Sequence, residues 1–338
     1  MRSFRCLATA WLLATAVASA GEWKVRSDIP YHVYGHAAAA VGGKIHLLGG
    51  CHTGDWQILT AVHQTYDPVA DKWERKADLP LPTGWSMPAV HGGKIYLFGG
   101  GYRKEGQGIT STDGAWVYDP ATDKWSALRK LPDVRMNGFA TAAGDFIYIS
   151  LGYNRQGGEY KGVVEEYKRT WRYDPKTDTY KRVADAPVNG CYIASGPHKG
   201  KVYSVPGAYD EYGFHGEYTW ADGALEYDPA ADRWTKIDAP RVAKRVFFLT
   251  QCSASVVNDG KLWIVGGMGE NRKRTVVTEY FDIEKRVFVR GPDIDYGRCC
   301  GGGGFSGNTL AIMGGFVDGA GTGTPALPTW TLETGGRK

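Results

Sequence analysis

Apolar and polar residues recur along the chain in a pattern with a period of about 50 residues. Each repeat contains an apolar run that ends in glycine, then a Tyr-Asp-Pro turn or a variant of it, then an aromatic residue. The apolar runs occupy residues 44–50, 94–100, 146–152, 201–207, 261–267 and 310–315. A repeat of this length predicts a β-propeller, in which each unit forms one blade.

Each repeat divides into four expected strands. A first strand of small residues, such as 36–41, leads through Gly42-Gly43 into the apolar second strand, because glycine pairs suit two-residue hairpins. The third strand ends at a turn such as Tyr66-Asp67-Pro68, where proline sets the turn and aspartate bonds the local backbone. We therefore interpret these aspartates as structural. The fourth strand begins with an aromatic residue: Trp73, Trp125, Tyr180, Trp234 or Phe288.

The sixth repeat has no fourth strand of its own at the C-terminal end. Residues 23–30 match residues 73–80 in spacing, whereas only residues 329–332 follow the sixth apolar run as a third strand. We predict that the N-terminal strand completes the last blade, which closes the ring and removes its open edges. The predicted fold is all-β, a six-bladed propeller that forms a single domain over residues 21–338.

The first 20 residues differ from the repeats. Arg2 and Arg5 precede an apolar stretch from Leu7 to Val17 and the small residues Ala18-Ser19-Ala20, which are features of a secretory signal peptide. We expect residues 1–20 to be removed and the protein to be periplasmic or secreted. No later stretch is long and apolar enough for a membrane span. The 40 Lys and Arg nearly balance 36 Asp and Glu, so we expect no nucleic-acid partner.

The connections between second and third strands should all lie on one face, and they differ in every repeat. Variable loops on a rigid scaffold commonly build binding sites, so we predict a ligand pocket over the axis on this face. Buried structural groups are the alternative interpretation of its polar side chains. The candidate substrate-binding residues at the ends of first strands and on the loops are Tyr34, His36, Trp85, Arg103, Arg155, Tyr192 and Gln251.

The connection over residues 208–220 combines aromatic and acidic side chains, with Tyr212 and His215 at its centre. Aromatic rings pack against the apolar faces of sugars, and carboxylates bond sugar hydroxyls. This composition predicts a small carbohydrate or glycan as the ligand. A loop packed on itself explains the same residues, and a protein partner is the alternative for the whole face.

Five cysteines follow residue 20, and Cys51 is followed by His52. If the first and last blades are neighbours, Cys51 and His52 approach Cys299 and Cys300. Thiolate and imidazole ligands suit zinc or copper, but we favour the alternative, small buried residues near a crowded axis with one disulfide among them. No metal-binding motif supports the first interpretation, and we expect no cofactor.

The double glycine, the tyrosine and the spaced tryptophan resemble Kelch repeats over about residues 23–334. The size and the expected export resemble the sialic-acid mutarotase (N-acetylneuraminate epimerase) type of bacterial Kelch protein. That resemblance implies a catalytic pair, Glu270 to move the anomeric proton and Arg274 to hold the sugar carboxylate. Tyr31-His32 is similar to adjacent ligands of copper radical oxidases, but those have a seventh blade. Our hypotheses are therefore carbohydrate binding, a sugar mutarotase, a protein-interaction scaffold and, fourth, a copper oxidase.

Overall fold

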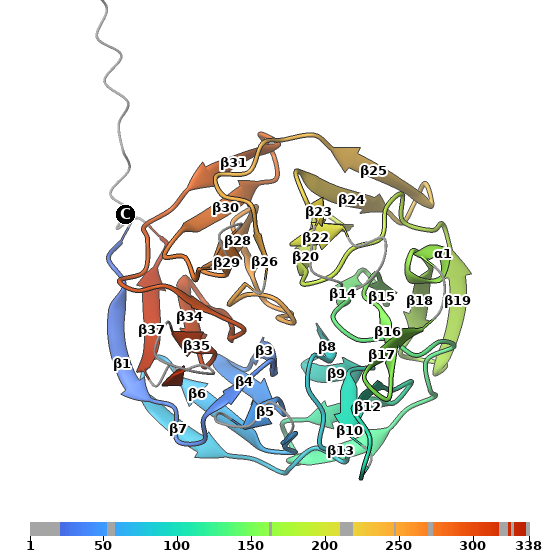
Figure 1. Cartoon of the computed structure of the whole chain (residues 1–338), viewed down its shortest axis with the longest axis horizontal. Coiled ribbons are helices and arrows are strands. Elements are labelled where there is room, and N and C mark those ends of the chain that lie inside the picture. The colour runs from blue at the N-terminus through green and yellow to red at the C-terminus, as the bar shows by residue number, and fades with distance from the viewer. Residues whose placement is uncertain are drawn as a thin grey trace, which may run out of the picture.

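The computed structural model describes residues 21–52, 58–103, 105–161, 164–209, 219–246, 248–269, 273–317, 324–325 and 328–335. Six four-stranded antiparallel sheets surround a central axis (Figure 1), which confirms the predicted six-bladed all-β propeller. The described part also contains one four-residue helix, α1 (Val164–Tyr167). None of its helices has the length and hydropathy needed to cross a membrane.

The blades are numbered from 1 to 6 along the chain. From the axis outward, blades 1 to 3 consist of β3 (Ala37–Val41), β4 (Lys44–Leu48), β6 (His63–Asp67) and β7 (Lys72–Arg75); β8 (Met87–His91), β9 (Lys94–Phe98), β12 (Ala115–Asp119) and β13 (Lys124–Ala127); and β14 (Phe139–Ala143), β15 (Phe146–Ser150), β18 (Thr170–Asp174) and β19 (Thr179–Val183). Blades 4 to 6 consist of β20 (Ala194–His198), β21 (Lys201–Val205), β24 (Ala224–Asp228) and β25 (Arg233–Ile237); β27 (Val257–Asn258), β28 (Lys261–Val265), β30 (Thr278–Asp282) and β31 (Val287–Arg290); and β33 (Gly302–Ser306), β34 (Thr309–Met313), β37 (Pro328–Glu333) and β1 (Lys24–Asp28).

The ring closes through the N-terminal strand, as predicted. β1 pairs antiparallel with β37, with Lys24 opposite Thr331 and Val25 opposite Trp330. The indole of Trp23 donates a 2.7 Å hydrogen bond to the carbonyl of Pro292 in blade 5. The first described residues therefore supply the outermost strand of blade 6.

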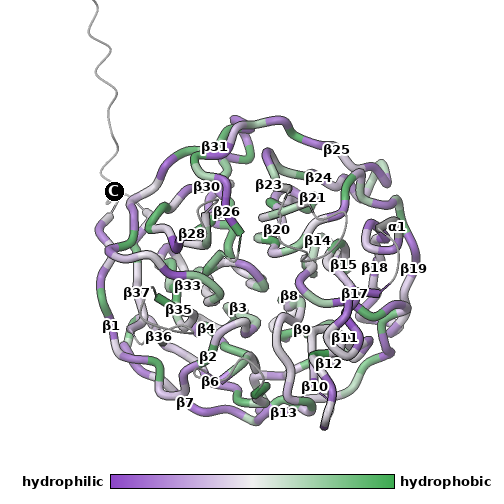
Figure 2. The backbone as a smooth tube through the Cα atoms, viewed as in Figure 1, coloured by the Kyte–Doolittle hydropathy of each residue, from purple (hydrophilic) through white to green (hydrophobic). Residues whose placement is uncertain are grey.

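The core lies between the blades, where the second strands are almost entirely buried and the outermost strands remain polar. Hydropathy follows the same division, with hydrophilic residues frequent along the outer rim (Figure 2). Small residues let the inner strands approach the axis. A Cβ at Gly302 would lie 2.5 Å from Nε2 of the buried His36, so blades 6 and 1 could not meet in this way with a larger residue there.

An aspartate after each Tyr-Asp-Pro turn joins neighbouring blades. The tyrosine hydroxyl of Tyr118 donates to Asp123 at 2.7 Å, and the backbone NH of Ala77 in blade 1 donates to the same oxygen at 2.9 Å. The indole of Trp125 donates to the carbonyl of Ala77 at 3.0 Å. We call this aspartate the blade latch. The equivalent latches are Asp71, Asp178 and Asp232.

The aspartate within each Tyr-Asp-Pro turn has the local role that the sequence predicts. Asp119 accepts the backbone NH of Ala121 at 2.9 Å, and Asp67 and Asp174 accept equivalent bonds. Blade 5 has no latch, because Phe281 replaces the tyrosine and Arg286 occupies the aspartate position. Arg286 instead pairs with Glu226 of blade 4 at 2.6 Å.

Blade 5 carries an insertion next to the axis. In blade 6, the hairpin-turn residue Gly307 lies 9 positions after Arg298, and blade 1 has the same spacing from Val33 to Gly42. In blade 5, Asp259 lies 14 positions after Arg245, the residue equivalent to Arg298. The sequence places Gln251 at the ribbon-face end of the first strand of blade 5 if residues are counted back from the hairpin turn, and the insertion makes this assignment wrong. Arg245 and Val246 hold the positions that pair with the strand of the following connection, and Gln251 belongs to the insertion.

The segment that follows the insertion lies against the inner strands of blades 1 and 6. Residues 252–256, which we call the axial plug, pair with blades 1 and 6: the NH of Ala38 donates to the carbonyl of Cys252 at 2.9 Å, and the NH of Phe305 donates to that of Ser255 at 2.8 Å. On its other side, Cys252 and Ser253 of the plug border a small cavity together with Pro88, Phe139 and Ile193 of blades 2, 3 and 4. The plug is thus bonded to two blades and faces the other three.

Candidate ligand-binding face

Short β-ribbons stand on the face where the long connections leave the second strands. We call it the ribbon face. Its strands pair as β2 (Val33–Tyr34) with β5 (Cys51–His52), β10 (Gly101–Arg103) with β11 (Ile109–Ser111), β16 (Asn154–Gln156) with β17 (Glu159–Lys161), β22 (Ala208–Tyr209) with β23 (Thr219–Trp220), β26 (Arg245–Val246) with β29 (Met268–Gly269), and β32 (Arg298–Cys299) with β35 (Phe316–Val317), which also pairs with β36 (Thr324–Pro325). The variable connections therefore extend the rigid blades.

Backbone hydrogen bonds link neighbouring blades around the axis just below these ribbons. The NH of Gly35 donates to the carbonyl of Cys300 at 2.7 Å, and the series continues from blade to blade through Trp85, Asn137 and Tyr192. All five residues have a positive φ, which costs a non-glycine residue about 1–2 kcal/mol. Together with the axial plug, this series surrounds the axis beneath the ribbon face, and we call it the floor.

A continuous set of side chains from four blades lies at this floor. The rings of Trp85 and Tyr34 are 6.5 Å apart, and Tyr34 packs at 4.0 Å from Phe316. The guanidinium of Arg274 lies 5.8 Å from the Phe316 ring. Tyr34 is buried, whereas Trp85, Phe316 and Arg274 are half-buried. We call these four residues the aromatic–arginine arc.

Three other predicted binding residues are enclosed by protein. His36 is fully buried, and burial lowers its pKa to about 3, so its ring is neutral. Tyr192 lies beside Tyr153, which receives a 2.7 Å hydrogen bond from the side chain of Asn137. Gln251 is 1% exposed in the blade 5 insertion. Because they are buried, these three residues are better placed to support the floor than to contact a ligand.

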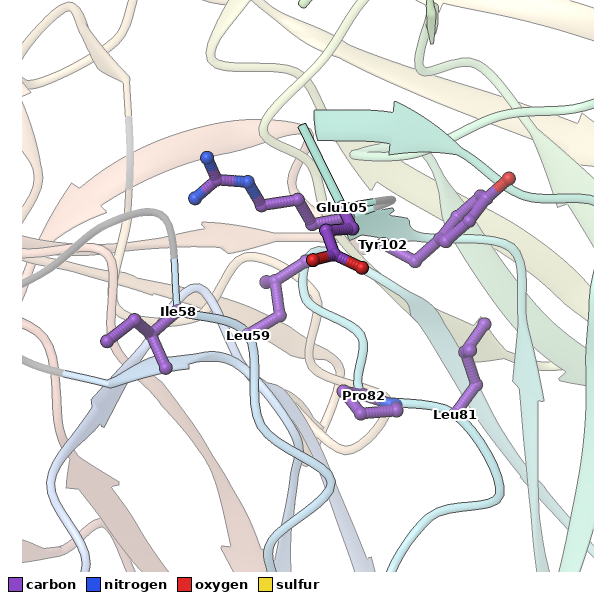
Figure 3. Close-up of a pocket in the computed structure, with 7 residues that line it drawn as sticks. Ile58, Leu59, Leu81, Pro82, Tyr102 and Glu105 are labelled. Carbon is purple, nitrogen blue, oxygen red and sulfur yellow. The ribbon is translucent and has the colours of Figure 1, made fainter. Parts of the chain in front are cut away.

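The predicted arginines on the ribbons are held by their own backbones. Nε of Arg103 donates to the carbonyl of Gln107 at 3.0 Å, and Nε of Arg155 donates to that of Gly158 at 2.8 Å. Arg103 also borders a cleft of about 300 Å³ between blades 1 and 2 (Figure 3). The other residues that line the cleft are Ile58, Leu59, Leu81, Pro82, Tyr102 and Glu105. Tyr212, His215 and Glu270 lie outside the described residues.

The structure brings together the cysteines that the sequence associates. Sγ of Cys299 and Sγ of Cys300 are 3.5 Å apart, and Cys51 and Arg274 both act electrostatically on Cys300. His52 packs instead against Tyr31, with ring centroids 5.2 Å apart. Within the described ranges, no group of three or more His, Cys, Asp or Glu side chains is arranged to hold a metal ion.

A buried charge cluster supports blade 5, and the sequence analysis missed it. Glu279 accepts a hydrogen bond from Nε of Arg241 at 2.7 Å and lies 3.4 Å from Arg245, and all three side chains are fully buried. Burial lowers the pKa of Arg245 to about 9. Arg245 also donates to the carbonyl of Ile264 at 3.0 Å. Arg245 belongs to β26, so this cluster positions one strand of the ribbon face.

Known proteins share this fold. A Kelch motif matches residues 88–132. Kelch-like protein 36 of Mus musculus is 24% identical over 276 residues, which cover 81% of this chain and 42% of that protein. Kelch-like protein terF of Aspergillus terreus is 26% identical over 268 residues, or 76% of this chain and 56% of that protein. The chain thus spans about half the length of these relatives.

The structure of YjhT aligns with a TM-score of 0.71 over 90% of this chain and 95% of that chain, at 17% identity. At this identity the likeness shows a common fold alone. Blade 2 coincides with the matched Kelch motif, and its four strands have the same arrangement as those of the other blades. The chain is a six-bladed β-propeller that carries a Kelch motif.

Proposed function

We propose that the ribbon face binds a carbohydrate that bears a carboxylate, and that the aromatic–arginine arc contacts it. The observation that carries this proposal is the continuity of the arc, in which half-buried Trp85 and Phe316 flank Tyr34 and Arg274 adjoins Phe316. Aromatic rings pack against the C–H faces of sugars. A guanidinium recognises a carboxylate through two parallel hydrogen bonds.

The backbone beneath the arc supports the proposal. The NH of Trp85 donates to the carbonyl of Gly35 at 2.6 Å, so the floor holds the backbone beside two rings of the arc. A concave site with apolar walls and few polar groups is the usual form of a small-molecule site. In this site, Arg274 would select the acidic group and Trp85 would select the sugar ring.

Calorimetric titration with N-acetylneuraminic acid and with neutral N-acetylglucosamine tests the proposal. Arg274→Ala should weaken binding of the acidic sugar about 10- to 100-fold, since a charge-assisted hydrogen bond contributes about 1.5–3 kcal/mol. Arg182→Ala is the matched control, because Arg182 lies on the outermost strand β19 and forms an exposed ion pair with Asp185. Equal effects of the two substitutions, or no binding of any acidic sugar, would refute the proposal.

A sugar mutarotase is the catalytic form of the same proposal. Arg274 belongs to the arc and would hold the sugar carboxylate, while Glu270, the expected proton-transfer group, lies outside the described residues. Exchange of the two anomers of N-acetylneuraminic acid, followed by NMR, separates catalysis from binding. Glu270→Gln should abolish the accelerated exchange and change the affinity for the sugar by no more than a few fold. If the unmodified protein does not accelerate exchange, the catalytic proposal is wrong and only the binding proposal remains.

Binding of a protein segment in the cleft between blades 1 and 2 is a second candidate. Ile58 is 52% exposed there, beside Leu59, and Arg103 and Glu105 supply charges at the rim. An apolar side chain flanked by polar groups would suit this cleft. Ile58→Asp should abolish cross-linking to a partner and leave sugar binding intact, whereas an unchanged cross-link would remove this candidate.

We also propose that the protein is exported after loss of residues 1–20. The basic start, the apolar stretch and the Ala18-Ser19-Ala20 site support this. Mass spectrometry of the protein expressed in a bacterial host should find a mature N-terminus at Gly21 in the periplasmic or extracellular fraction. A chain that retains its first 20 residues in the cell would contradict it.

A further inference from the structure

Two adjacent cysteines at the edge of the ribbon face have an arrangement that an ordinary strand does not allow. Successive side chains of a β-strand point to opposite sides, so adjacent cysteines keep their sulfurs apart. Cys299 ends β32, where it lies opposite Phe316. Cys300 has a φ of 60°, which breaks the alternation. Its Sγ therefore lies 3.5 Å from Sγ of Cys299, to which the Cys300 thiol donates a weak hydrogen bond.

The backbone on both sides of this pair is held in place. The carbonyl of Cys300 accepts a 2.7 Å hydrogen bond from the NH of Gly35. The preceding residue, Arg298, is fully buried and donates to the carbonyl of Gly314 at 2.8 Å. The two sulfurs are thus kept side by side by the fold, and side-chain rotation is the simplest way for them to approach further.

We infer that Cys299 and Cys300 form a redox-active dithiol that closes to a vicinal disulfide by exchange with a small disulfide such as oxidised glutathione. Cys300 is half-buried and Cys299 is buried, so the thiolate of Cys300 attacks the small disulfide first. One glutathione thiolate leaves, and Cys300 becomes a mixed disulfide. The sulfur of Cys299 then attacks Sγ of Cys300 and releases the second glutathione thiolate. The two protein thiols are oxidised, the small disulfide is reduced, and the two protons end on the two glutathione thiols.

The rate of this exchange should depend on pH. The hydrogen bond with Cys299 and burial both raise the pKa of the Cys300 thiol. A thiolate is the attacking species, so exchange should be slow at neutral pH and should accelerate as the pH rises. Cys51 is the third thiol of the group and the competing partner, since it also acts on Cys300.

Peptide mapping of the full chain tests the inference. After equilibration with oxidised glutathione and alkylation with N-ethylmaleimide, trypsin places Cys299 and Cys300 together on residues 299–337 and Cys51 on residues 45–72. We expect the first peptide to be two hydrogens lighter and to lose both maleimide labels. Cys51→Ser should leave this result unchanged, and Cys300→Ser should abolish it.

Three outcomes of the map would overturn the inference. They are two labelled thiols on residues 299–337 at every oxidant concentration, a glutathione adduct that never proceeds to the internal disulfide, and a link between this peptide and residues 45–72. Because the unmodified protein gives each of these results directly, poor folding of a cysteine variant would not obscure the answer.

Discussion

The latch at Asp123 should contribute strongly to the stability of the junction between blades 1 and 2. Its Oδ1 accepts the hydroxyl of buried Tyr118 and the backbone NH of Ala77. Asp123 also has a φ of 52°, a conformation that aspartate and asparagine tolerate better than alanine. Replacing it by alanine removes two hydrogen bonds between or within blades and strains the turn at the same time.

The expected loss for Asp123→Ala is about 3 kcal/mol in the free energy of unfolding. Each hydrogen bond contributes about 1 kcal/mol, because the carboxylate is exposed and water weakens its bonds. Alanine in the left-handed conformation adds about 1 kcal/mol. Asp123→Asn keeps the acceptor oxygen and the tolerated conformation, so its loss should be about 1 kcal/mol or less. For a chain of this length, 3 kcal/mol lowers the melting temperature by about 5 °C.

Urea unfolding followed by tryptophan fluorescence measures these differences. Asp145→Ala is the matched control, since Asp145 is a highly exposed turn residue that pairs with exposed Lys176; its loss should be under about 0.5 kcal/mol. Combining Asp123→Ala with Tyr118→Phe tests the mechanism, because the second change should cost less once the acceptor is gone. Equal losses for Asp123→Ala and Asp145→Ala, or full additivity of the pair, would refute the latch.

Two further predictions concern the ring closure and acid. Deleting residues 21–29 removes β1 and Trp23, uncovers the edge of β37, and should lower the melting temperature by about 10 °C or more. Val25→Ala within β1 should have little effect, because Val25 is 60% exposed. Similar melting temperatures of the two variants would contradict closure by β1. Burial lowers the pKa of His36 and of His46 to about 3 and that of His63 to about 4, from an ordinary 6.5. The folded state is therefore most stable above pH 6.5, and the free energy of unfolding should decrease as the pH falls below that value, by up to about 1.4 kcal/mol per pH unit for each histidine. Unfolding free energies that stay constant between about pH 7 and 4.5 would contradict these neutral rings.

The repeat predicted the blades because local patterning and turn chemistry agree in each unit. The Gly-Gly runs, the Tyr-Asp-Pro turns and the match of residues 23–30 to residues 73–80 led to six blades and to the strand that closes them. The latch was missed, although an aspartate five residues after Tyr66, Tyr118, Tyr173 and Tyr227 was a visible signal. Its role depends on a contact with the preceding blade, which periodicity alone does not indicate.

The candidate site was less accessible to sequence reasoning. Counting from the hairpin turn hid the insertion in blade 5, because extra residues before Cys252 leave the spacing after it unchanged. Phe316 belongs to a connection whose sequence differs in every repeat, and its contact with Tyr34 joins opposite ends of the chain. The Glu279 cluster likewise joins separate segments. Tertiary contacts of this kind carry no local periodic signal.

The pairing of β1 with β37 also constrains how the chain can fold. Lys24 meets Thr331, so β1 finds its partner only after the other five blades have been made. Contacts this distant in sequence form slowly, and until then an unpaired strand could add to the sheet of another molecule. Lys24, Arg26 and Asp28 place charges along that waiting strand. These charges would keep nascent copies apart until blade 6 is assembled.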